Sequence, residues 1–142
     1  MAGNILIVDD TPAVLKLLKD ILSAEDYKAR PFNNGELALR SLKVEPPELI
    51  LLDVRMPVMD GFEVCRRIKE DERLKDIPII FISAAADTED KVRAFQAGGV
   101  DYITKPFQKE EVIARVQTHV TLYRSRQKLM QAEKALRKSE QS

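Results

Sequence analysis

The sequence predicts an α/β fold in which five parallel strands form one sheet with helices on both faces. Short apolar runs alternate with helical patterns five times along the chain, and such alternation is typical of a parallel sheet. The runs are apolar throughout, as expected of strands that are buried on both sides. The chain has 142 residues and is 44% hydrophobic, which fits about one domain with a single sizeable core.

The first strand is expected at residues 4–8 and ends in Asp9 and Asp10. A hydroxyl at Thr11 followed by Pro12 predicts a helix start, with Thr11 as the N-cap. Apolar residues at helical spacing continue this helix to about Ser23.

A weaker strand is expected at residues 27–32, where the apolar pattern is less regular. The run Asn33-Asn34-Gly35 then turns the chain into a second helix. That helix ends before Pro46-Pro47, because proline cannot continue the helical hydrogen bonds.

The third strand covers residues 49–52 and ends in a single acid, Asp53. A turn-forming segment with Pro57 and Asp60-Gly61 follows it. The next helix is expected to carry apolar residues from Phe62 to Ile68 and to end near Arg73.

The fourth strand is expected at residues 77–82 and ends in Ser83. A helix follows, opened by residues 87–89 and closed by Gly98-Gly99, since glycine readily takes the left-handed conformation of a helix end. The fifth strand covers residues 100–104. The last helix begins near Gln108 and shows no stop signal through Ser142.

Bulk composition excludes several classes of protein. Basic and acidic residues number 23 each, which argues against direct nucleic-acid binding by this chain. Cys65 is the only cysteine, so neither an internal disulfide nor a thiolate metal cage is available. The N-terminus lacks a signal-peptide pattern, and no apolar run approaches the ~20 residues of a membrane span. We therefore expect a cytoplasmic protein without membrane contact.

Reactive side chains stand at the ends of four predicted strands. They are Asp9 and Asp10, then Asp53, Ser83 and Lys105. The carboxyl ends of parallel strands meet at one edge of a sheet, so these residues should converge. Three carboxylates together favour a hard cation such as Mg²⁺. A carboxylate can also act as a nucleophile toward phosphorus, and Asp53 is the candidate.

Four motifs in this order resemble the receiver domain of bacterial two-component response regulators. They are ILIVDD, LILLDVRMPVMDG, IIFISA and DYITKPF, and the resemblance covers roughly residues 3–122. It implies a flavodoxin-like sheet with strand order 2-1-3-4-5.

The resemblance implies a metal site and a phosphoacceptor. Asp53 matches the phosphoacceptor, and Asp9 and Asp10 match the acidic pair that holds Mg²⁺. The backbone carbonyl of Arg55 matches a further metal ligand. Arg55 and Ala85 also occupy positions that, in the family, tune how long the phosphoryl group lasts.

The resemblance also implies a switch. Lys105 matches the lysine of the site, and the Lys105-Pro106 bond falls where the family has a cis peptide. Ser83 matches the hydroxyl switch residue and Tyr102 the aromatic one. Phosphorylation would then alter the face formed by the fourth helix, the fifth strand and the fifth helix, and the C-terminal helix would transmit the change. The implied partner is a histidine kinase or phosphotransfer protein, and no enzyme activity is expected beyond self-phosphorylation and autodephosphorylation.

The chain continues past the end expected for a receiver. We expect a receiver domain at residues 1–121 and a helical extension at 122–142 that leads to an output domain outside this chain. Leu122, Leu129 and Leu136 fall seven residues apart. This spacing is consistent with a coiled coil, which would support a homodimer through the fifth helix and the extension. A solvated basic helix is the alternative.

Three other functions compete with the switch. The main alternative is a pseudo-receiver that no longer cycles and serves as a protein-interaction scaffold. A phosphohydrolase would need a second acid just after Asp53, where Val54 and Arg55 stand instead. A stand-alone phosphate shuttle would not need the long extension.

Overall fold

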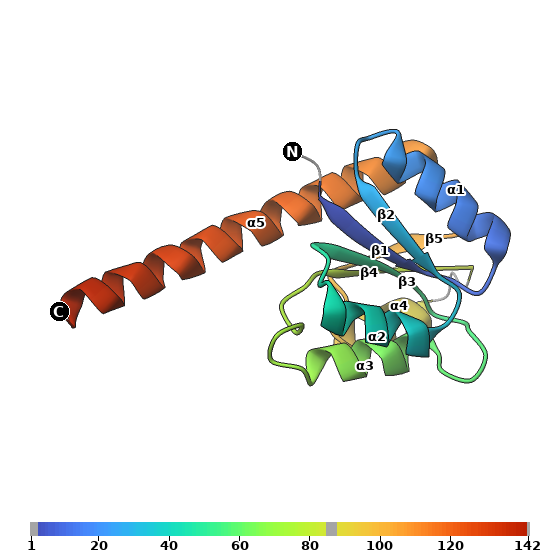
Figure 1. Cartoon of the computed structure of the whole chain (residues 1–142). Helices are drawn as coiled ribbons and strands as arrows, with labels where there is room; N and C mark the ends of the chain where they lie inside the picture. The colour runs from blue at the N-terminus through green and yellow to red at the C-terminus, as the bar shows by residue number, and fades with distance from the viewer. Residues whose placement is uncertain (1–2, 85–87, 142) are drawn as a thin grey trace.

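The computed structural model describes residues 3–84 and 88–141. A parallel sheet of five strands, in the order β2-β1-β3-β4-β5, lies at its centre (Figure 1). The predicted fold class and the strand order implied by the resemblance are both confirmed. In chain order the strands are β1 (Asn4–Val8), β2 (Lys28–Phe32), β3 (Leu49–Asp53), β4 (Ile79–Ser83) and β5 (Asp101–Thr104).

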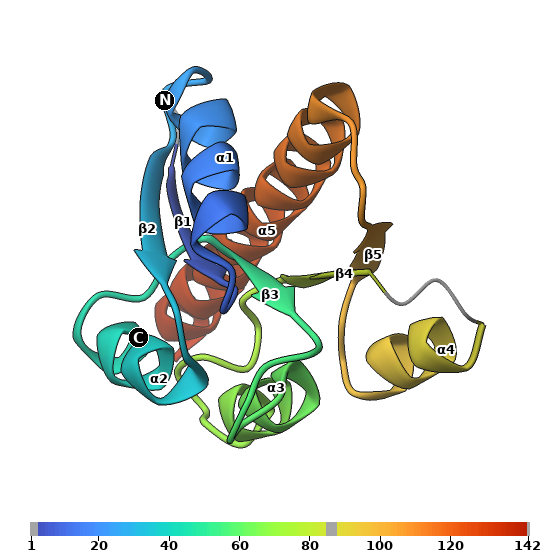
Figure 2. The same cartoon turned by 90° about the vertical axis from the view of Figure 1, so that its right-hand side faces the viewer.

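Helices cover both faces of the sheet, as Figures 1 and 2 show. Helices α1 and α5 lie on one face, and α2, α3 and α4 on the other. Their bounds are α1 (Pro12–Ser23), α2 (Gly35–Val44), α3 (Gly61–Lys69), α4 (Thr88–Gln96) and α5 (Lys109–Glu140).

Each face of the sheet has its own apolar core, because side chains of a strand point alternately to opposite faces. Ile5 and Ile7 of β1 belong to the core beneath α1 and α5. Leu6 and Val8 belong to the core beneath the other three helices. All four side chains are fully buried, which explains why the strand is apolar without interruption.

Two predicted element ends were wrong by a few residues. Helix α3 ends at Lys69 rather than near Arg73, and the Asp71 carboxylate accepts the Arg73 N–H at 2.8 Å, a local turn that competes with helix. Strand β4 begins at Ile79 rather than Ile77, since Pro78 has no N–H to donate to the sheet.

The remaining predicted ends lie close to those observed. Strands β2 and β5 begin one residue later than predicted. Thr11 is the N-cap of α1, but its side chain forms no capping bond; instead its N–H donates to Asp9 Oδ1 at 2.9 Å. Helix α4 begins at Thr88, whereas the predicted opening residue Asp87 lies outside the described residues.

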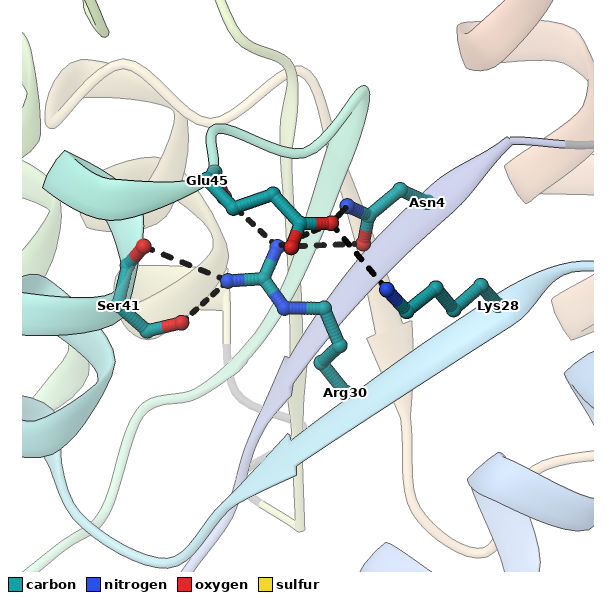
Figure 3. Close-up of polar contacts among 5 residues, drawn as sticks. All are labelled: Asn4, Lys28, Arg30, Ser41 and Glu45. Atoms are coloured by element: carbon teal, nitrogen blue, oxygen red, sulfur yellow. Dashed lines mark hydrogen bonds and ion pairs between the residues drawn. The ribbon is translucent and has the colours of Figure 1, made fainter.

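A polar cluster ties the end of α2 to the sheet edge (Figure 3). Arg30 of β2 donates to the backbone carbonyls of Glu45 and Ser41, at 2.7 and 3.4 Å, and also to the Ser41 hydroxyl. Its guanidinium further donates to Asn4 Oδ1 of β1 at 3.2 Å. A largely buried cation therefore binds two carbonyls at the end of α2, of which that of Ser41 also accepts the Glu45 N–H at 2.9 Å.

Helix α5 is attached to the sheet by apolar packing and by two groups of ion pairs. Asp101 at the start of β5 bonds Arg115 at 2.7 Å and His119 at 3.0 Å. Further along, Arg124 bonds both carboxylate oxygens of Glu48 at 2.5 and 2.8 Å. Beyond these contacts α5 projects away from the sheet (Figure 1), and every residue from Lys128 to Gln141 is exposed.

Within residues 3–84 and 88–141, none of the helices combines the length and the apolar character that crossing a bilayer requires.

Candidate functional site

Three aspartates meet at the carboxyl edge of the sheet, as predicted. Asp9 follows β1 and is fully buried, and Asp53 ends β3 with 3% of its surface exposed. Asp10 is exposed at the rim. One carboxylate oxygen from each lies within 4.8 Å of the others. Asp9 and Asp53, 44 positions apart in the sequence, are therefore close neighbours because β1 and β3 are adjacent and parallel.

Lys105 reaches the same pocket from the end of β5. Its Nζ lies 2.8 Å from Asp9 Oδ2 and 3.7 Å from Asp53 Oδ1. The Lys105 N–H donates to the carbonyl of Ser83 at 2.8 Å, which joins the ends of β5 and β4. The Lys105-Pro106 peptide is cis, as the resemblance implied.

Asp53 is held in an environment that disfavours its charge. Burial raises the pKa of its carboxyl to about 7, and the neighbouring negative charge of Asp9 adds to this effect. Lys105 opposes the rise, and Asp10 contributes to it. The pocket therefore carries more negative than positive charge.

The loop after Asp53 is shaped by a glycine that the sequence indicated only as part of a turn. The Gly61 N–H donates to the Val54 carbonyl at 2.9 Å. A Cβ at Gly61 would lie 2.1 Å from the carbonyl oxygen of Asp53, so only glycine fits there. Next to it, Asp60 caps α3 by accepting the Glu63 N–H at 2.9 Å.

The same loop contains a strained residue. Val58 has φ +69°, a left-handed conformation that a β-branched side chain rarely adopts. The Met59 N–H donates to the Pro57 carbonyl at 2.8 Å, so Val58 sits at the centre of a tight three-residue turn. Its side chain is fully exposed.

Ser83 and Tyr102 lie on neighbouring strands. Ser83 ends β4 and is fully buried, and Tyr102 of β5 is 7% exposed. In the register of the two strands, Tyr102 pairs with Phe81 and Thr104 pairs with Ser83. The Lys91 ammonium of α4 lies 5.9 Å from the centre of the Tyr102 ring.

Sequence reasoning missed one contact beside the site. Arg55 Nη2 lies 2.6 Å from Asp90 Oδ2, and the Asp90 side chain is only 10% exposed. The backbone N–H of Arg55 also bonds the Asp53 carboxylate. Arg55 thus connects the pocket to α4. Nothing in the sequence signals a pair that is separated by 35 positions.

The residues present fit a hard divalent cation. Asp9, Asp10 and Asp53 offer oxygen atoms alone, the donor type that Mg²⁺ prefers. Two of the three carboxylates are buried, and among residues 3–84 and 88–141 the Lys105 ammonium balances only part of their charge. A cation in the pocket would correct that imbalance.

The fold and this pocket are those of a receiver. Residues 5–117 match the response regulator receiver domain, and the chain belongs to that family. Receiver domains of response regulators are phosphorylated on an aspartate by histidine kinases and bind Mg²⁺ in their acidic pocket.

Two curated relatives match most of the length of this chain. RpaA of Synechocystis sp., a DNA-binding dual master transcriptional regulator, is 41% identical over 114 residues, which cover 80% of this chain and 47% of RpaA. The response regulator PleD of Caulobacter vibrioides is 39% identical over 118 residues, or 83% of this chain and 26% of PleD. The chain thus spans about a quarter to a half of the length of these curated relatives.

Two solved structures resemble the chain over most of its length. The receiver domain of the sensor histidine kinase PA1611 from Pseudomonas aeruginosa, with magnesium coordinated in its active site cleft, has a TM-score of 0.79 and 31% identity and covers 85% of this chain and 99% of that one. NtrX from Brucella abortus has a TM-score of 0.85 and 27% identity and covers 92% of this chain and 30% of that one.

Proposed function

We propose that Asp53 is the phosphoacceptor of a two-component signalling switch, and that its donor is a histidine kinase or a phosphotransfer protein. The observation that carries this proposal is the position of Asp53, buried at the end of β3 between two other carboxylates and 3.7 Å from Lys105. Membership of the receiver family supports it.

The chemistry follows from the charges of the pocket. A carboxylate oxygen of Asp53 attacks phosphorus, the bond from phosphorus to the donor's imidazole nitrogen breaks, and the bonding electrons leave with that nitrogen. Lys105 neutralises the phosphoryl oxygens, and the Ser83 hydroxyl donates a hydrogen bond to one of them. Phosphoryl transfer depends mainly on such positioning and charge neutralisation.

Mg²⁺ would be held by Asp9, Asp10, Asp53 and the backbone carbonyl of Arg55, and when bound it supplies positive charge to the phosphoryl oxygens. Asp9 also bonds Lys105. Asp9 therefore orients the lysine as well as contributing a donor atom.

The switch would run from Ser83 and Tyr102 to the face formed by α4, β5 and α5, and on to the C-terminal helix. Tyr102 directly follows Asp101, whose carboxylate anchors α5 through Arg115 and His119. A movement of Tyr102 would therefore displace the neighbouring residue Asp101, which attaches α5 to the sheet. The contact of Arg55 with Asp90 gives a second link, from the pocket to α4.

The division of the chain belongs to the same proposal. Residues 1–121 form the receiver domain and residues 122–142 the link to an output domain, with a homodimer through α5 and the extension. The chain catalyses only its own phosphorylation and dephosphorylation, acts in the cytoplasm and does not itself bind nucleic acid.

The test is the intact mass of the chain after incubation with Mg²⁺ and acetyl phosphate. We expect the wild type to gain one phosphoryl mass and Asp53→Asn to gain none, because the amide keeps the shape of the side chain and is not nucleophilic. If the wild type binds Mg²⁺ but gains no mass from acetyl phosphate or from any histidine kinase, the scaffold function replaces the switch.

A further inference from the structure

One ion pair connects the loop after Asp53 to helix α4. Arg55 Nη2 lies 2.6 Å from Asp90 Oδ2. The two side chains differ in exposure, because that of Asp90 is 10% exposed and that of Arg55 is 65% exposed. A carboxylate so far withdrawn from water needs positive charge or hydrogen bonds beside it. Arg55 supplies such a charge through a side chain that has room to rotate on its solvent side.

The pair lies where α4 has little apolar contact with the rest of the protein. The buried residues of α4 are Asp90 and Ala94, whereas Val92 and Phe95 are 47% and 52% exposed. Alanine buries little apolar surface, so the charged contact of Asp90 is a substantial part of what attaches the start of α4.

The backbone of Arg55 places its side chain beside the expected phosphoacceptor. The Arg55 N–H bonds the Asp53 carboxylate, so a phosphoryl group on Asp53 would form within reach of the Arg55 guanidinium. Such a group carries close to two negative charges at neutral pH, and a guanidinium binds phosphate oxygens in a two-pronged geometry. The Asp90 carboxylate, with one negative charge, would then face a stronger acceptor for the same cation.

Resting on the proposed function of Asp53, we infer that Asp90 is a positioning residue that holds the Arg55 guanidinium on α4 and competes for it with the phosphoryl group. Phosphorylation moves Arg55 from Asp90 to the phosphoryl oxygens and so loosens the start of α4. Lys91, the residue after Asp90, lies 5.9 Å from the centre of the Tyr102 ring. The same displacement therefore reaches the predicted aromatic switch residue.

The resting pair is tested on the unphosphorylated full chain. Arg55→Gln, Asp90→Asn and the double variant are compared with the wild type by urea unfolding in the presence of a chelator. The effects of the two single substitutions should not add, and the difference should correspond to at least about threefold in the unfolding equilibrium constant. Additive effects would show that the two side chains do not stabilise each other, and would overturn the inference.

The competition is tested with beryllofluoride, which takes the place of a phosphoryl group on a carboxylate. Its apparent affinity for the full chain is measured by fluorine NMR at saturating Mg²⁺. Asp90→Asn should bind it on the order of fivefold more tightly than the wild type, because Arg55 no longer has to leave a charged partner. In an Arg55→Gln background the same substitution should change the affinity less than about twofold.

Glu89→Gln is the matched control, because Glu89 is exposed and stands in the same first turn of α4. Among the residues that the structure describes, Glu89 forms no ion pair with Arg55, and its loss should change the affinity less than about twofold. Equal effects of Glu89→Gln and Asp90→Asn, or an Asp90→Asn effect that persists without Arg55, would overturn the inference and leave the phosphoacceptor role intact. A wild type that does not bind beryllofluoride would overturn both.

Discussion

At the scale of single residues, the site is an electrostatic compromise. In the proposed phosphoryl transfer Asp53 reacts only when it is charged, yet burial and the Asp9 carboxylate raise its pKa to about 7. The Lys105 ammonium, whose Nζ lies 3.7 Å from Asp53 Oδ1, opposes part of this rise in pKa. A charged carboxylate at this position therefore lowers the stability of the fold, as is common at functional sites.

Asp53→Asn should stabilise the metal-free protein. Between the ordinary pKa of 3.8 and about 7, the unfolded wild type loses its proton while the folded state keeps it, so stability falls as pH rises and the loss is complete above the folded pKa. The neutral amide avoids this loss. We expect a gain of roughly 2 kcal/mol at pH 8 and a smaller one at pH 5.

Urea unfolding in the presence of a chelator measures this difference at each pH. A gain that is the same at pH 8 and pH 5 would show that the charge of Asp53 is not its source.

Val58→Gly should also stabilise the protein. Valine at φ +69° is strained by roughly 1–2 kcal/mol, and glycine removes the strain while costing about 0.5–1 kcal/mol in the entropy of the unfolded chain. The expected net gain is about 0.5–1 kcal/mol in thermal or urea unfolding. Val58→Ala keeps the Cβ and should gain less; an alanine variant at least as stable as the glycine variant would contradict the strain argument.

At the scale of the elements, a few specific contacts join the helices to the sheet and to the neighbouring loops. Gly61 lets the start of α3 approach the backbone of Asp53. Arg30 binds the last carbonyls of α2, and Asp101 holds α5. Each contact fixes a helix against another part of the chain, by close approach of the backbone at Gly61 and by charged side chains at Arg30 and Asp101.

Arg30→Leu should loosen the end of α2. The side chain is 13% exposed, and its loss leaves the carbonyls of Ser41 and Glu45 without this donor, at a cost of roughly 2 kcal/mol. Lys28→Leu is the matched control, because Lys28 pairs with the same Glu45 from a side chain that is 67% exposed and should cost less than about 0.5 kcal/mol. Equal losses in urea unfolding would show that Arg30 acts only as a surface charge.

At the scale of the whole molecule, α5 crosses from the receiver into the extension without a break. The family match ends at residue 117, whereas Tyr123 still packs against the core and Arg124 still bonds Glu48. The helix is continuous, so a movement of its attached part is carried to its far end.

Two truncations separate the attached part of the extension from its free part. Removing residues 128–142 should change the unfolding free energy of the receiver by less than about 0.5 kcal/mol, because that segment is exposed. Removing residues 122–142 should cost roughly 1–2 kcal/mol, because Tyr123 and Arg124 are lost. The measurement is urea unfolding at protein concentrations below dimerisation, and equal effects would show that Tyr123 and Arg124 add nothing measurable to the stability of residues 1–121.

Much of the fold and the site could be predicted from the sequence, because apolar runs and reactive residues recur at strand ends. The alternation of apolar runs with helical patterns predicts five strands and five helices. The rule that parallel strands end at one edge predicts that Asp9, Asp10, Asp53 and Lys105 converge. The predicted end of α3 was wrong because residues 70–73 have a composition typical of a helix, whereas the Asp71 side chain forms a local turn there by accepting the Arg73 N–H. The roles assigned to Asp53, Ser83 and Tyr102 stay predictions until phosphorylation is measured.

The sequence by itself determined the order of the elements, the residues of the pocket and the family, because periodicity and strand-end chemistry are local properties of the chain. Only the tertiary structure decided that Arg55 reaches Asp90, that Asp101 anchors α5, and that Gly61 approaches the backbone of Asp53. These contacts depend on how helices are placed against a twisted sheet. That placement results from packing in three dimensions, which no local pattern encodes.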